Sequence, residues 1–139
     1  MYKKILLIDD DADEQFIFIE AFKDINILVK FFTASTGEEG IRLMKFLIPD
    51  IVFLDINMPG LSGFDCLKII KRDNYINKIP VVIYSTGVNA VVFDDAVKNG
   101  AITCIKKQDT IKELTCLLKE FLVPVKLSDV MDYDAMPFV

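Results

Sequence analysis

The chain has 139 residues, of which 53% are hydrophobic, which suffices for one folded domain and is too much for a disordered protein. Its 16 basic and 21 acidic residues give a formal net charge of −5, which disfavours general binding to nucleic acid or to an anionic membrane surface. It contains no histidine, which excludes Ser-His-Asp and Cys-His catalysis, histidine-bearing zinc sites and an imidazole general base.

The cysteines and the apolar runs indicate the cellular compartment of the protein. Cys66, Cys104 and Cys116 are an odd number, lie far apart and form no CxxC pair, so we expect reduced thiols. No stretch approaches the ~18 apolar residues of a membrane span, and the N-terminus does not resemble a signal peptide. We therefore expect a soluble, cytoplasmic protein.

Short apolar runs alternate with longer amphipathic segments along the chain. The runs predict strands at residues 5–8, 28–33, 51–54, 81–84 and 102–105, and the segments predict helices at 13–25, 36–48, 63–72, 89–99 and 109–122. In the first helix, Phe16, Ile19 and Phe22 recur at helical spacing; before the second, Ser35 and Glu38 resemble a capping box. Continuous apolar strands alternating with helices indicate a doubly wound α/β fold with one parallel sheet.

Polar side chains follow four of the five predicted strands. In chain order they are Asp9, Asp10 and Asp11, then Asp55 and Asn57, then Ser85 and Thr86, and finally Lys106 and Lys107. Open parallel sheets bind ligands beyond the carboxyl ends of their strands, so we expect these groups to converge at one edge. Each could have a plain structural role alone, as a turn, cap, buried ion pair or surface charge, but their coincidence at four strand ends favours a site.

The predicted cluster suits a narrow range of chemistry. Carboxylates with a backbone carbonyl and waters make the all-oxygen site that Mg²⁺ prefers. Asp55 ends an apolar strand, where an unpaired carboxylate is costly, so a cation or a lysine should lie beside it. A carboxylate can also attack phosphorus and form an aspartyl phosphate, while Mg²⁺, lysine and a hydroxyl offset the phosphoryl charge.

Several segments together resemble the response-regulator receiver domain of two-component signalling. They are Ile5 to Asp10, the D-x-x-M-P-G segment from Asp55 to Gly60, Ile79 to Ser85, and Asn99 to Ala101 leading to Lys107. The resemblance covers about residues 2–123 and implies a flavodoxin-like sheet of five strands in the order 2-1-3-4-5 with five helices. It further implies a receiver domain at residues 1–123. Residues 124–139 fit no further strand–helix pair, so we expect a tail there and no separate output domain.

The resemblance also implies a role for each residue of the cluster. Asp55 would be the phospho-acceptor, supplied by a histidine on a partner kinase. Asp10, Asp55 and the backbone carbonyl of Asn57 would bind Mg²⁺ directly, and Asp9 would bind it through water. Ser85 would be the switch hydroxyl and Lys107 the cationic partner, whereas Lys106 is one residue out of register.

Three positions depart from the family's usual pattern. Gln108 replaces the proline that commonly follows the lysine, often after a cis peptide bond, so we expect either a trans bond or local strain here. Cys104 replaces an aromatic switch residue, which puts the usual coupling of hydroxyl and ring in question. Thr86 is bulkier than the usual small residue, and we hypothesise that it slows loss of phosphate.

The partners implied are a sensor histidine kinase or phosphotransfer protein and an unidentified downstream protein, but neither nucleic acid nor membrane. The family pattern places the kinase contact around the first helix, including Gln15 and Phe18, and allows a homodimer through the last helix–strand–helix face. The protein would then be a signalling switch with slow self-dephosphorylation, not an enzyme. Two alternatives stay open: a haloacid-dehalogenase-type Mg²⁺ phosphohydrolase with Asp9 as nucleophile, and a degenerate receiver acting as a binding module.

Overall fold

The computed structural model describes residues 2–25 and 28–120, in which five parallel strands form one sheet in the order β2-β1-β3-β4-β5. The strands are β1 (Tyr2–Ile8), β2 (Leu28–Ala34), β3 (Ile51–Leu54), β4 (Val81–Ser85) and β5 (Thr103–Lys106). The helices are α1 (Ala12–Lys23), α2 (Gly37–Leu47), α3 (Gly63–Arg72), α4 (Ala90–Lys98) and a last helix at residues 111–120. The predicted doubly wound fold, strand order and five helices are confirmed, whereas the predicted tail lies outside the described residues.

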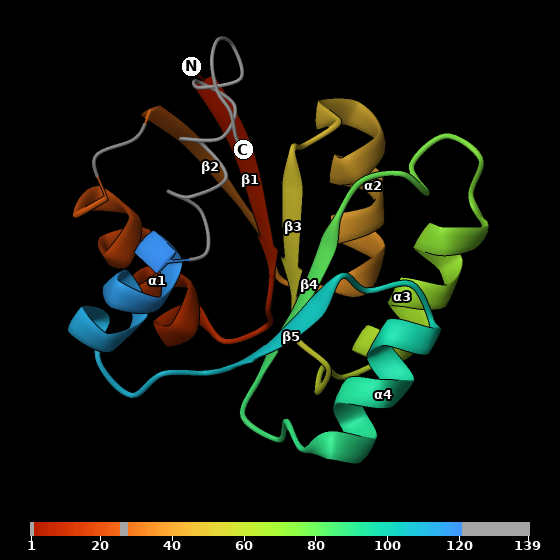
Figure 1. Ribbon diagram of the computed structural model, residues 1–139. Helices are drawn as coiled ribbons and strands as arrows, with labels where there is room; N and C mark the ends of the chain where they lie inside the picture. Colours follow the sequence, from red (N-terminus) through yellow and green to blue (C-terminus); the bar gives the residue numbers. More distant parts are fainter. Residues whose placement is uncertain (1, 26–27, 121–139) are drawn as a thin grey trace, which may run out of the picture.

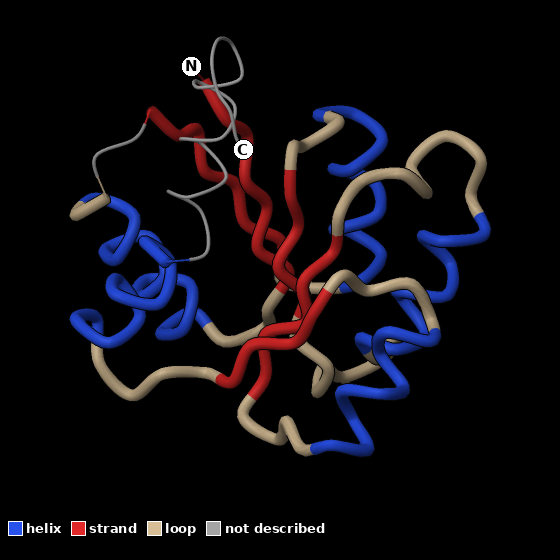
Figure 2. Tube along the Cα trace, viewed as in Figure 1, coloured by secondary structure: helices blue, strands red, loops and turns tan. Residues whose placement is uncertain are grey.

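The helices cover both faces of the sheet. Figure 1 shows α1, in orange-red, and the last helix, in blue, on one side of the strands. It shows α2, α3 and α4 on the other side. The same three layers are visible in Figure 2, where the strands lie between two groups of helices. Because all strands run in the same direction, their carboxyl ends meet at one edge of the sheet, at the bottom of both views.

Two separate apolar cores follow from the alternation of side chains along the strands. Leu6 and Ile8 of β1 belong to the core beneath α2, α3 and α4, whereas Ile5 and Leu7 belong to the core beneath α1 and the last helix. The second core is rich in aromatic rings; its stacked, tilted and edge-on contacts join Phe18, Phe22, Phe31, Phe53 and Tyr84. Apolar side chains therefore cover both faces of the sheet, and a polar site has room only at the ends of the strands.

The structure adds detail to one helix pattern and corrects another. The buried stripe of α1 contains Phe18, Ala21 and Phe22, whereas Phe16 is 59% exposed. The cause is the helical period of 3.6 residues, which a strict spacing of three does not follow. At α2 the N-cap is Thr36 rather than Ser35, since its side chain accepts a hydrogen bond from the backbone N–H of Glu39.

Candidate functional site

The two central carboxylates of the site are held by the ends of adjacent strands. The backbone N–H of Asp55 donates to the carbonyl of Ile8 (3.0 Å), and that of Asp9 donates to the carbonyl of Ala34 (3.0 Å). These bonds extend the parallel ladders by one residue and thereby fix where both side chains leave the sheet. Asp9 is fully buried and Asp55 is 4% exposed.

A third carboxylate completes an acidic cluster. One oxygen each from Asp9, Asp10 and Asp55 lies within 4.8 Å of the others, and Asp10 is exposed to solvent. Asp11, by contrast, caps α1 by accepting from the backbone N–H of Asp13 (2.9 Å), and its own N–H donates to Asp9 Oδ1 (3.0 Å). The capping role therefore applies to Asp11, and the other acids remain available to the site.

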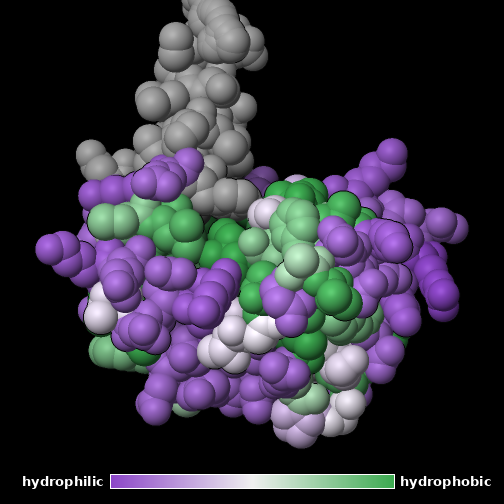
Figure 3. Space-filling view, turned by 60° about the horizontal axis from the view of Figure 1, so that its bottom comes forward, coloured by the Kyte–Doolittle hydropathy of each residue, from purple (hydrophilic) through white to green (hydrophobic). Residues whose placement is uncertain are grey.

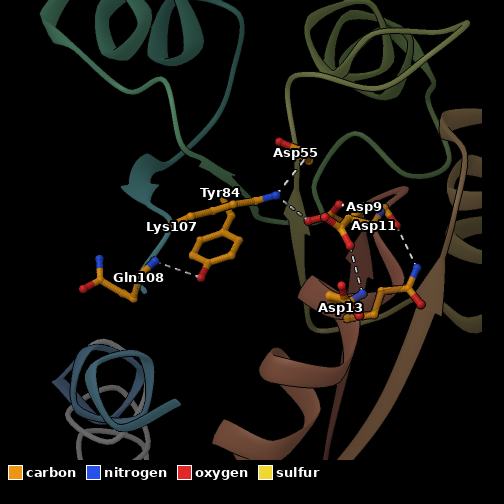
Figure 4. A network of polar contacts seen from close by, with 8 residues as sticks. Asp9, Asp11, Asp13, Asp55, Tyr84, Lys107 and Gln108 are labelled. Carbon is orange, nitrogen blue, oxygen red and sulfur yellow. Dashed lines mark hydrogen bonds and ion pairs between the residues drawn. The ribbon is translucent and has the colours of Figure 1, made fainter. Parts of the chain in front are cut away.

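Lys107 supplies the positive charge that the buried acids need. Its Nζ lies 2.9 Å from Asp9 Oδ2 and 3.6 Å from Asp55 Oδ2, so the ammonium group sits between the two carboxylates (Figure 4). The backbone N–H of Lys107 donates to the carbonyl of Ser85 (3.0 Å), which ties the loop after β5 to the end of β4. Lys106 is exposed, and of these two lysines it is Lys107 whose ammonium lies against the acids.

Burial and charge act against each other on these groups. Burial raises the pKa of Asp55, although the nearby Lys107 ammonium counteracts part of this effect. For Lys107, burial alone would lower the pKa, but the hydrogen bond and charge of Asp9, together with Asp55, raise it overall. The lysine therefore stays protonated, while burial acts against the charged form of the Asp55 carboxyl.

The remaining predicted side chains line or underlie the same pocket. Asp9, Asp10, Asp55, Asn57, Thr86 and Lys107 all line a pocket open to solvent. Ser85 is the last residue of β4 and is fully buried. Its Oγ makes no hydrogen bond of standard geometry in the described part of the chain, but its nearness to Asp55 lowers the pKa of that carboxyl and so offsets part of the effect of burial. Hydrophilic residues form much of the surface on this side of the molecule (Figure 3).

The structure adds an acidic side chain that the sequence reasoning missed. Glu14, in the first turn of α1, also lines the pocket, and its Oε1 is buried without a hydrogen-bond partner among the described residues. Burial raises the pKa of Glu14, and the negative charges of Asp9, Asp11 and Asp55 act in the same direction. Its position in the first turn of α1, just after the end of β1, is a signal that could have revealed it, because a helical side chain leans toward the helix N-terminus.

The three departures from the family pattern have distinct surroundings. The Lys107–Gln108 bond is trans, because the described residues contain no cis peptide bond. The Gln108 side chain donates to the carbonyl of Lys106 (2.7 Å). Cys104 is partly buried against the core beneath α2, α3 and α4, and Thr86 is exposed at the pocket.

Comparison with known proteins places this fold and site in a family. Residues 5–119 match the model of the response regulator receiver domain. The chain therefore belongs to the response-regulator receiver family of two-component signalling, as its motifs indicated. A curated relative, the probable C4-dicarboxylate response regulator DctR of Bacillus subtilis, is 30% identical over 121 residues, which are 85% of this chain and 51% of that protein.

Other relatives show the range of proteins that contain such a domain. Protein PilH of Pseudomonas aeruginosa is 32% identical over 60% of this chain and 67% of its own length. A protein-glutamate methylesterase/protein-glutamine glutaminase of Methanococcoides burtonii is 27% identical over 88% of this chain and 35% of its own length. The chain spans about half the length of the first curated relatives it matches.

Solved structures match the fold over nearly the whole chain. The phosphorylated cyanobacterial phytochrome response regulator RcpA has a TM-score of 0.76 at 24% identity, covering 90% of this chain and 96% of its own. The chemotaxis protein CheY4 of Vibrio cholerae has a TM-score of 0.74 at 21% identity, covering 88% and 100%. The Mn²⁺-bound form of response regulator Rcp1 has a TM-score of 0.71 at 22% identity, covering 98% and 99%.

The structure also bears on the expected surfaces. Phe18 is fully buried, so its predicted place in a kinase-binding surface is wrong; the side chain belongs to the aromatic core. In residues 2–25 and 28–120, no helix is both long enough and apolar enough to cross a bilayer. Cys66, Cys104 and Cys116 are all free thiols, as predicted.

Proposed function

We propose that this receiver domain accepts a phosphoryl group on Asp55 from a partner histidine kinase or phosphotransfer protein. The observation that carries the proposal is the position of the Asp55 carboxylate: nearly buried at the base of an open acidic pocket, 3.6 Å from the Lys107 ammonium. Asp9 and Asp10 lie beside it and offer carboxylate oxygens to a cation, whereas the Lys107 ammonium offers positive charge to phosphoryl oxygens.

The donor atoms of the pocket fit a magnesium ion. All three clustered side chains offer carboxylate oxygens, and neither histidine nor cysteine lines the pocket, which suits a hard cation better than zinc or copper. Asp10, Asp55 and the carbonyl of Asn57 would hold the ion directly, and Asp9 would hold it through water. When bound, the ion would offset negative charge on the phosphoryl oxygens.

The transfer needs no acid or base from this chain. An Asp55 oxygen attacks phosphorus, the bond between phosphorus and the donor nitrogen breaks, and the electron pair stays on that nitrogen. The partner histidine leaves as neutral imidazole because its other ring nitrogen carries a proton. Lys107 places positive charge against the phosphoryl oxygens, and the buried Ser85 hydroxyl can turn to donate to one of them. A later attack of water on phosphorus would restore the Asp55 carboxylate and release phosphate.

The geometry disfavours the phosphohydrolase alternative, in which Asp9 is the nucleophile. Asp9 is fully buried, its Oδ1 accepts from the N–H of Asp11 and its Oδ2 is 2.9 Å from the Lys107 ammonium. Asp9 is therefore more buried and more tightly paired than Asp55, which is 4% exposed and lies 3.6 Å from the same ammonium, and this disfavours Asp9 as the nucleophile.

We further propose that residues 1–123 form the receiver, that 124–139 are a tail, and that the output is a contact with a downstream protein in the cytoplasm. Support for an output through the receiver itself comes from CheY4 and RcpA, which this chain covers almost entirely. Val91, Phe93, Val97 and Ile102 are exposed on α4 and just before β5, which supports this face as the contact surface or homodimer surface.

Intact mass spectrometry tests the function. We expect incubation with Mg²⁺ and a small acyl phosphate to add one phosphoryl group, about 80 Da, that is absent in Asp55→Asn and present in the exposed-acid control Asp94→Asn. Turnover of phosphate esters without Asp55 would instead support a phosphohydrolase. If no adduct forms in any variant, the chain is a binding module and the proposal fails.

A further inference from the structure

One hydrogen bond connects the immediate neighbours of two site residues. The backbone N–H of Gln108 donates to the Tyr84 hydroxyl at 3.3 Å, as Figure 4 shows. Tyr84 directly precedes Ser85 in β4, and Gln108 directly follows Lys107. The contact therefore links the strand that carries the buried hydroxyl to the loop that carries the cationic side chain.

The Tyr84 side chain is a rigid anchor for such a contact. It is 1% exposed and meets the ring of Phe18 edge-on, with centroids 5.1 Å apart and planes at 82°. Burial raises the pKa of Tyr84 to about 12, so the phenol stays protonated. A ring held in this way places its hydroxyl with little freedom, because rotation would disrupt the aromatic core.

The loop after β5 is fixed by short bonds around the lysine. The Lys107 N–H donates to the Ser85 carbonyl (3.0 Å), and Gln108 Nε2 donates to the Lys106 carbonyl (2.7 Å). The Gln108 N–H reaches the Tyr84 hydroxyl, and the Lys107 ammonium lies 6.0 Å from the centroid of the Tyr84 ring. Tyr84 thus contacts the loop after β5 through its hydroxyl, and its ring lies near the Lys107 ammonium.

We propose that Tyr84 and the Gln108 N–H form a positioning pair that holds Lys107 between Asp9 and Asp55. A proline at position 108 could not take part, because it has no N–H to donate. The non-proline residue at this position is then a functional half of the contact. The proposal depends on the proposed function for its consequence in phosphoryl transfer, but not for the contact itself.

Hydrogen exchange tests the contact directly. Tyr84→Phe keeps the ring and removes only the hydroxyl, so we expect faster exchange of the Gln108 amide. The Lys107 amide, which is bonded to Ser85, is the internal control and should keep its exchange rate. Unchanged Gln108 exchange in Tyr84→Phe would overturn the proposal, as would equal acceleration at both amides, which indicates general loosening.

A double-mutant cycle tests the consequence, with the rate of phosphorylation by a small acyl phosphate as readout. Tyr84→Phe should slow the reaction about three- to tenfold, the range of one neutral hydrogen bond. It should have no further effect in Gln108→Pro, which lacks the N–H, but its full effect in Gln108→Ala, which keeps it. Independent effects of Tyr84→Phe and Gln108→Pro would contradict the pair.

The two proposals fail in different ways. If the wild-type chain does not react with acyl phosphate, the proposed function fails, and amide exchange still decides whether Tyr84 holds the loop. If the wild type reacts and Tyr84→Phe reacts at the same rate, phosphoryl transfer stands and the positioning role is refuted. If Gln108→Pro does not fold, the comparison of Tyr84→Phe with wild type remains decisive through the exchange measurement.

Discussion

At the scale of single residues, the ion pair of Lys107 with Asp9 is the interaction on which the site depends most. Asp9 is fully buried and the Lys107 side chain is 9% exposed, so neither charge is solvated well enough to stand alone. We expect Lys107→Ala to lower the free energy of unfolding by about 3 kcal/mol or more, because it leaves a buried carboxylate unpaired. Denaturant titration measures the change.

The neighbouring lysine provides the control for that experiment. Lys106 is exposed, so Lys106→Ala should change stability by no more than ~0.5 kcal/mol. Equal effects of the two substitutions would contradict the assignment of Lys107 as the buried cation.

The raised pKa of Asp55 makes stability depend on pH. Burial raises the pKa of this carboxyl in the folded state above its ordinary value of 3.8, so the unfolded chain loses its proton first as pH rises. As the pH rises from 3.8 through the raised folded pKa, ionisation of Asp55 therefore destabilises the fold by an increasing amount. We expect metal-free Asp55→Asn to be more stable than wild type near neutral pH, with the difference vanishing at acidic pH in denaturant titrations. A constant difference at all pH values would contradict this origin.

Thr86 is a further single residue that bears on the chemistry, because it lines the same pocket as Asp55. If its bulk obstructs the water that attacks the phosphoryl group, Thr86→Ala should lose phosphate several-fold faster than wild type. Thr86→Ser, which keeps the hydroxyl and removes the methyl group, separates bulk from hydrogen bonding. We expect it to be intermediate in a time course of adduct loss, and no acceleration in either variant would refute the hypothesis.

At the scale of elements, the start of α3 controls the loop that follows the acceptor. A Cβ on Gly63 would collide with the backbone carbonyl oxygen of Asp55 and approach the Cα of Ile56 to 2.6 Å. Gly63→Ala should therefore displace this loop and cost about 1–3 kcal/mol in unfolding free energy, with slower phosphorylation. Gly87→Ala is the control, since nothing lies within 4 Å of its added Cβ; similar losses in both would contradict the steric account.

The elements were predictable where one pattern was unambiguous. The strand at 51–54 and the helix at 63–72 have the bounds that their apolar run, apolar face and flanking turn residues indicated. The buried face of α1 was not predictable, because apolar residues occur on several of its faces. Packing against the aromatic core selects Phe18 and Phe22. Ser85 and Lys106 were expected after their strands and instead end them, since boundaries depend on which neighbours pair.

At the scale of the whole molecule, the convergence of the site followed from topology alone. Once five parallel strands were predicted, the groups after them had to meet at one edge, and Asp9, Asp55 and Lys107 do so. The parts that sequence did not predict depend on side-chain direction in the folded core: Glu14 at the pocket and the Tyr84 contact to Gln108. Both arise where a helix or an aromatic cluster packs against the strand ends, which spacing along the chain does not describe.

The identity of the phosphorylated residue is the central claim, and borohydride mapping tests it most directly. An aspartyl phosphate is an acyl phosphate, which borohydride reduces to an alcohol and thereby converts the labelled aspartate into homoserine. After treatment with Mg²⁺ and an acyl phosphate, peptide sequencing by mass spectrometry should locate homoserine at position 55 and nowhere else. Homoserine at Asp9 or Asp10, or none at any position, would contradict the account.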